Sequence, residues 1–118
     1  MSSRLRRRQA KRKKPVKTYF HRTTESAATE IFRNGFRDAR GQYLTDTEHQ
    51  GVWLSDKPLD CNEGAKGEVL LAVDIDPTIV EKHEWVEEGK PYREYLVPAK
   101  WLNSHARIRR ATKKEEEQ

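Results

Sequence analysis

Three short segments combine aromatic residues with polar side chains that could do chemistry: YFHRT at 19–23, GVWLSD at 51–56 and YREYLVP at 92–98. In the first, His21 is either a structural imidazole or a functional one that donates or accepts a hydrogen bond in a chosen tautomer, or transfers a proton near neutral pH. In the third, Glu94 lies within a strand-like pattern, where a carboxylate is disfavoured unless it is solvated or paired. It is therefore either the partner of Arg93 or another cation, or a fixed charge. A fixed carboxylate can hold a ribose hydroxyl and stabilise positive charge at an anomeric carbon.

The other reactive residue types do not form a recognisable motif. Ser55, with an aspartate directly after it, fits a strand end with a helix cap as well as it fits the edge of a site. The remaining histidines, His49, His83 and His105, lack the spacing of metal ligands, so no metal site is predicted. Cys61 is the only cysteine, which excludes an internal disulfide, and no histidine near it in sequence supports a catalytic thiol. A lone cysteine is consistent with a cytoplasmic location.

The apolar pattern predicts the elements that must position these side chains. A strand over 17–22 leads into a helix that Thr23 or Thr24 caps and Gly35 ends. Further strands are predicted from alternating or continuous apolar residues, over 51–55, 68–75, 92–97 and 106–110.

The intervening segments are predicted to be mostly irregular. Residues 37–50 are expected to form a long polar loop, 56–65 a turn with one short helix, and 99–103 a helical turn. Residues 78–90 fit both helix and loop. One main helix with several short strands predicts an α+β domain with mainly antiparallel pairing.

Positive charge is concentrated at the N-terminus. Nine of the first 17 residues are Lys or Arg and none is acidic, whereas residues 18–118 hold 15 basic and 19 acidic residues. We expect a disordered basic tail over 1–17, a domain over 18–111 and a charged disordered tail over 112–118. Phosphate contacts from residues 4–17 would make nucleic acid a partner, and a role in solubility alone is the alternative. No stretch approaches the roughly 18 apolar residues of a membrane helix, so no membrane partner is expected.

Taken in order, the segments resemble the ADP-ribosyltransferase superfamily, on its poly(ADP-ribose) polymerase and RNA 2′-phosphotransferase side. That family opens with a His-bearing strand and a helix that ends in Gly and an aromatic residue, here YFHRTTESAATEIFRNGF at 19–36. GVWLSD matches its second strand motif, and GEVLLAVDID at 67–76 matches an apolar strand opened by Gly. EYLV at 94–97 stands where the polymerases carry their catalytic Glu. The similarity spans residues 19–97 and implies a mainly antiparallel split sheet with one main helix and short helices.

The resemblance implies NAD as the cofactor and a role for each matching residue. His21 would hydrogen-bond a ribose hydroxyl and orient NAD. Glu94 would anchor the nicotinamide ribose and support an oxocarbenium-like transition state. The other cofactor-binding positions that the resemblance implies are Thr23, Trp53, Ser55 and Asn62, with Glu63 as the alternative to Asn62.

Two departures from the family pattern shape the predicted activity. Arg22 follows His21 where the polymerases have Gly, and CNEGA at 61–65 replaces the segment that carries their second-motif Tyr. Both argue against polymer formation and favour mono-ADP-ribosyl transfer to a protein or nucleic-acid acceptor. NAD hydrolysis and a degenerate domain stay open.

Two further functions remain as alternatives. One is an RNA 2′-phosphotransferase-like enzyme. The other is a non-enzymatic nucleic-acid-binding domain that combines the basic tail with exposed aromatic residues and the C-terminal cations Arg107, Arg109, Arg110, Lys113 and Lys114.

Overall fold

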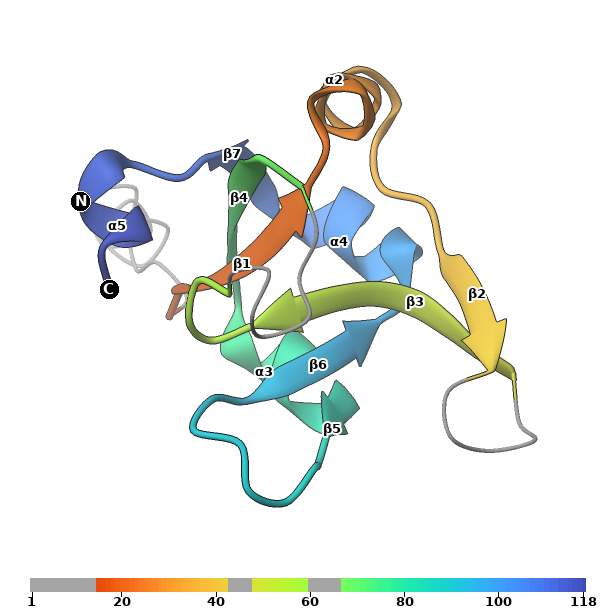
Figure 1. Cartoon of the computed structure of the whole chain (residues 1–118). Helices are drawn as coiled ribbons and strands as arrows, with labels where there is room; N and C mark the ends of the chain where they lie inside the picture. Colours follow the sequence, from red (N-terminus) through yellow and green to blue (C-terminus); the bar gives the residue numbers. More distant parts are fainter. Residues whose placement is uncertain (1–14, 43–47, 60–66) are drawn as a thin grey trace, which may run out of the picture.

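The computed structural model describes residues 15–42, 48–59 and 67–118 (Figure 1). Seven strands and several short helices follow one another in this order: β1 (Lys17–Thr23), α2 (Glu25–Asn34), β2 (Ala39–Gln42), β3 (Glu48–Ser55), β4 (Val69–Ile75), α3 (Pro77–Val80), η2 (Glu81–His83), β5 (Glu84–Trp85), β6 (Glu94–Val97), α4 (Ala99–His105), β7 (Arg107–Arg110) and α5 (Lys113–Glu116). The domain is α+β, as the sequence predicts.

All strand pairings among the described residues are antiparallel, and the sheet order is β5-β6-β3-β1-β4-β7, with β2 added to β3. The central strand β1 is paired unequally on its two sides. It matches β4 over its whole length, from Lys17↔Ile75 to Thr23↔Val69, but it matches β3 at Phe20↔Ser55 alone. Figure 1 shows β1 and β3 running apart from this point.

The main core lies on one face of the sheet, under α2, α3 and α4. β4 reads VLLAVDI and is buried on both faces, which explains its nearly continuous apolar sequence. Its Leu71 and Val73 belong to one buried cluster that also contains residues of β1, β6 and the helices α2, α3 and α4. Among these residues are Tyr19, Ala28, Val80, Tyr95 and Leu102. A smaller cluster of Phe20, Leu70 and Ala72 lies on the opposite face. Each fully buried Leu or Val contributes about 2 kcal/mol to folding by leaving water.

Helix α2 begins and ends where the sequence predicts. The Thr24 side chain accepts a hydrogen bond from the Ala27 amide, and Gly35 ends the helix with a φ of 87°. The side chain of Asn103, from α4, then fixes the exit of the chain. Its Oδ1 accepts from the Phe36 amide at 2.8 Å and its Nδ2 donates to the Phe36 carbonyl at 3.0 Å. A Cβ on Gly35 would lie 2.7 Å from that Oδ1. Both this close approach and the positive φ therefore require glycine at this position.

Several segments differ from the prediction. Part of the expected loop over 37–50 is the β2–β3 pair, in which Ala39 to Gln42 match Gly51 to Glu48. The undecided stretch 78–90 contains the end of α3, then η2 and β5, and α3 starts at Pro77 after an Asp76 cap. The strand expected from 92 begins at Glu94. The short helix expected within 56–65 falls partly outside the described residues.

The C-terminus also differs, because the expected disordered tail contains the short helix α5. Thr112 and Glu115 form a reciprocal capping box at its start. No helix in the described ranges combines the length and apolarity of a membrane span.

Candidate functional site

His21 lies at the point where β1 and β3 separate. Its Nδ1 is 2.8 Å from the carbonyl oxygen of Trp53, on β3. A carbonyl only accepts, so Nδ1 carries the proton and Nε2 is left as an acceptor when the ring is neutral. The His21 and Phe36 rings meet edge to face, with centroids 5.4 Å apart. Burial lowers the pKa of His21 below its usual 6.5, which favours the neutral ring at physiological pH.

Glu94 lies in a row that crosses three strands. Phe20 on β1 is in register with Ser55 on β3, and Ser55 is in register with Glu94 on β6. Side chains directly opposite one another share a face, so Ser55 and Glu94 project on the side of Phe20. His21, one residue further along β1, projects on the side of Phe36 and the main core. The two proposed catalytic side chains therefore leave the sheet on opposite faces, and they do not hydrogen-bond one another.

Ser55 and Asp56 hold the chain in place beside Glu94. Ser55 is 5 % exposed, and its hydroxyl donates to the Lys57 carbonyl at 2.6 Å. Asp56 pairs with the backbone of Arg93, accepting from its amide at 2.8 Å and donating its own amide to the carbonyl at 3.0 Å. This segment ends the strand, as one reading of the sequence predicts, and it also fixes the residue that precedes Glu94.

The Glu94 carboxylate is held by a cation that the sequence does not single out. Lys90 Nζ is 2.9 Å from Glu94 Oε1, and the Glu94 side chain is 19 % exposed. Arg93, the neighbour considered from sequence, pairs with Glu84 at 3.8 Å instead. The same Lys90 also pairs with Glu87. The spacing of one acid three residues before Lys90 and another four residues after it indicates such a cluster only in a helix, and this segment is not helical.

A shallow pocket opens beside Glu94, with a volume of about 180 Å³. Its walls come from β5, the following turn and the start of β6, and they include Trp85, Lys90 and Tyr92. Trp85 meets Trp53 edge to face at 5.6 Å. Trp53 therefore connects the two parts of the candidate site, because its carbonyl binds His21 and its ring contacts the pocket wall.

Thr23 ends β1 at a tight crossing. A Cβ on Gly67 would lie 2.1 Å from the Thr23 carbonyl oxygen, and Gly67 has a φ of 113°. Only glycine fits there, which explains the Gly that opens the apolar strand β4. Arg22 is also engaged, since its Nε donates to the Leu59 carbonyl. Asn62 and Glu63, like Cys61, lie outside the described residues.

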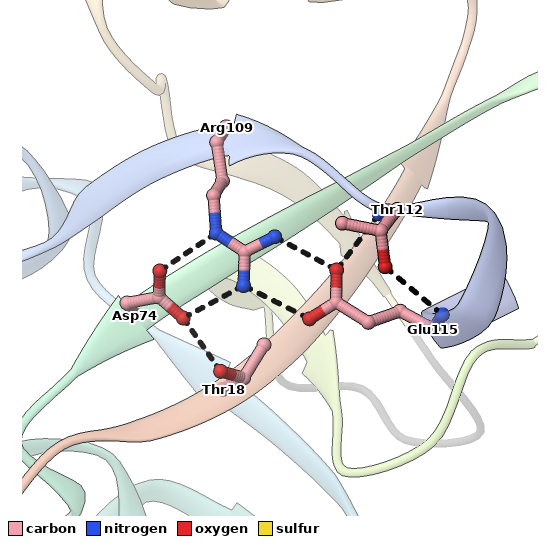
Figure 2. A network of polar contacts seen from close by, with 5 residues as sticks. All are labelled: Thr18, Asp74, Arg109, Thr112 and Glu115. Carbon is pink, nitrogen blue, oxygen red and sulfur yellow. Dashed lines mark hydrogen bonds and ion pairs between the residues drawn. The ribbon is translucent and has the colours of Figure 1, made fainter.

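The C-terminal cations of the nucleic-acid alternative are only partly available. Arg109 binds Asp74 at 2.9 Å and Glu115 at 2.7 Å, inside the network that Figure 2 shows. Arg110 binds Glu25 at 2.6 Å. Arg107, Lys113 and Lys114 are exposed.

An exposed aromatic residue lies elsewhere on the surface, on α4. Trp101 is 37 % exposed, and the ammonium groups of Lys82 and Lys100 lie 5.7 and 5.3 Å from its ring centre. This cluster contains no residue of the candidate site around His21 and Glu94. The chain was compared with family models, curated proteins and solved structures, and none of them matches it.

Proposed function

We propose that this domain binds NAD and transfers a single ADP-ribose to a protein or nucleic-acid acceptor. The observation that carries the proposal is the placement of the three motif segments on adjacent strands. Phe20, Ser55 and Glu94 form one row across β1, β3 and β6. His21 follows directly after that row, where the ladder between β1 and β3 ends.

His21 has the protonation state that its proposed role requires. With Nδ1 donating to Trp53, the free Nε2 of the neutral ring accepts a hydrogen bond, and a ribose hydroxyl is a suitable donor. The bond to Trp53 also fixes the ring plane, so the acceptor is oriented before NAD arrives. Burial supports this state by lowering the pKa of His21.

Glu94 supplies the negative charge. During the reaction the bond between the ribose C1′ and the nicotinamide nitrogen breaks, and nicotinamide leaves as a neutral base with the bonding electrons. Positive charge then develops on the ribose, and a nearby carboxylate stabilises it most strongly in the transition state. The acceptor nucleophile forms the new bond to C1′ and loses its proton. The register row places Glu94 two strands from His21, and the two side chains leave the sheet on opposite faces. The proposal therefore requires NAD to extend from one face to the other where β1 and β3 separate.

The experiment is an NMR titration of the labelled protein with NAD, with nicotinamide release followed in the same tube. Saturable shifts around His21 and Glu94 are expected, with slow release that Glu94→Gln abolishes. Glu88→Gln is the matched control, because Glu88 is an exposed carboxylate of the same turn. Absence of any shift at millimolar NAD would overturn the proposal.

A second candidate, nucleic-acid binding, is favoured by the Trp101 cluster. An exposed indole flanked by two ammonium groups offers base stacking and phosphate contacts together. Under this function, affinity for a single-stranded oligonucleotide falls steeply with salt, and Trp101→Ala weakens it by about 1–3 kcal/mol. Glu94→Gln should leave that affinity unchanged.

A further inference from the structure

Lys90 lies between two carboxylates in the turn that joins β5 to β6. Its ammonium group is 2.5 Å from Glu87 Oε2 and 2.9 Å from Glu94 Oε1. The hydrogen bonds to Glu87 and then Glu94 raise the pKa of Lys90, so the group is cationic throughout the physiological range. Its side chain is 27 % exposed, which leaves it accessible to a competing ligand.

The turn brings the cation to Glu94 from the side of the pocket. Gly89, with a φ of 84°, reverses the chain just before Lys90. The Lys90 ammonium lies 5.4 Å from the centre of the Tyr92 ring, and Glu87, Lys90, Tyr92 and Glu94 all line the pocket. Lys90 therefore stands on the approach to the Glu94 carboxylate.

This position conflicts with the role proposed for Glu94. A carboxylate stabilises positive charge on a ribose through its own field, and an ammonium at hydrogen-bonding distance cancels most of that field. Lys90 also occupies one of the oxygens that a ribose hydroxyl would bind. Glu87 can relieve this conflict, because it is an alternative counterion that already contacts the Lys90 ammonium group.

We propose that Lys90 is a competing cation that blocks Glu94, and that Glu87 draws it away when NAD binds. The inference rests on the proposed function and adds a regulatory pair to the same site. Glu87 and Lys90 are positioning residues, since both act through Glu94. The two residues have opposite effects on turnover although they form one ion pair.

The test is nicotinamide release by full-length Lys90→Met, Glu87→Gln and the double variant, each first checked for an unchanged melting temperature. Lys90→Met is expected to raise kcat/KM for NAD about five- to tenfold, the effect of removing one partly exposed ion pair. Glu87→Gln is expected to lower it by a similar factor, because Glu94 becomes the only carboxylate that binds Lys90. In the Lys90→Met background Glu87→Gln should be silent, since Glu87 acts only through Lys90. Lys90→Arg, which keeps the charge, should stay close to the wild type.

The outcomes separate this inference from the function on which it rests. If Glu94→Gln abolishes release while Lys90→Met leaves it unchanged or lowers it, the inference is overturned and the proposed function stands. If neither the wild type nor Lys90→Met binds NAD, both are overturned. A purely structural ion pair would make Lys90→Met and Glu87→Gln change turnover in the same direction, which also contradicts the inference.

Discussion

The imidazole of His21 donates from Nδ1 to the carbonyl oxygen of Trp53 at 2.8 Å, across the point where β1 and β3 stop pairing. The Trp53 carbonyl, which lies beside the end of the β1–β3 ladder, thus accepts a hydrogen bond from a side chain. This contact sets the tautomer and the orientation of the ring, and it adds a side-chain bond to the Phe20↔Ser55 pairing that joins the two strands.

The first prediction concerns pH. Burial lowers the pKa of His21 below 6.5, so the unfolded chain binds the proton more readily than the folded one. The stability that the neutral ring contributes is complete above pH 6.5 and is lost as the pH falls toward the folded-state pKa. Each unit of lowering is worth about 1.4 kcal/mol. Urea unfolding between pH 5 and 7.5 should show a steeper loss for the wild type than for His21→Gln, and parallel curves would contradict the assignment.

The second prediction concerns the crossing of Gly67 and Thr23. Gly67→Ala should destabilise the protein by about 3 kcal/mol or more, because the new methyl group overlaps the Thr23 carbonyl and the φ of 113° is itself strained. Gly89→Ala is the control. It has similar strain at a φ of 84° with nothing within 4 Å, and should cost about 1 kcal/mol. Equal melting temperatures for the two variants would show that the Thr23 carbonyl can move away from the new methyl group.

The third prediction concerns the support of the His21 ring. Asn103→Ala removes both hydrogen bonds to the Phe36 backbone and should lower the free energy of unfolding by about 1–3 kcal/mol. Because Phe36 packs against His21, the imidazole NMR signals should shift as well. Ser104→Ala, an exposed change on the same helix, should do neither. If the variant is destabilised but the His21 signals do not shift, the Asn103 hydrogen bonds do not support the His21 ring.

The fourth prediction concerns the C-terminal network of Figure 2. Hydrogen bonds from Arg109 and then from the Thr112 backbone lower the pKa of Glu115 to about 2. The ionised form therefore contributes stability above pH 4.5, and this contribution disappears as the pH falls toward 2. At pH 7 Glu115→Gln should cost about 1–3 kcal/mol in thermal unfolding, whereas Glu117→Gln on the exposed end should stay within about 0.5 kcal/mol. The cost of Glu115→Gln should shrink in acid.

Much of the fold follows from local sequence signals. β1, β4 and α2 could be predicted because aromatic or continuous apolar residues mark the strands and Thr24 and Gly35 mark the helix ends. These signals act within a few residues, so they are visible without knowledge of the tertiary structure.

The missed features depend on backbone pairing, on turn geometry or on polar side-chain contacts, none of which the apolar pattern shows. β2 reads ARGQ and has no apolar alternation, and it is a strand because its backbone pairs with β3. α5 is held by the ion pair between Arg109 and Glu115 and by its capping box. At the candidate site, sequence types predicted His21 and Glu94 as chemical groups. The sequence could not show that a turn places Lys90 on Glu94.

β1 and β3 are paired at one position only, and this seam between them divides the sheet into two halves. The two halves can move as separate units only if the seam loosens. One half contains β1, β4 and β7, and the other contains β2, β3, β5 and β6. Few backbone bonds cross the seam, so it is joined mainly by side chains, with Tyr19 against Tyr95 at 5.2 Å and His21 bound to Trp53. Because few backbone bonds hold the seam, amide hydrogens of β3 that face it should exchange faster than those between β1 and β4. A ligand bound across the seam would bridge the two halves and slow that exchange.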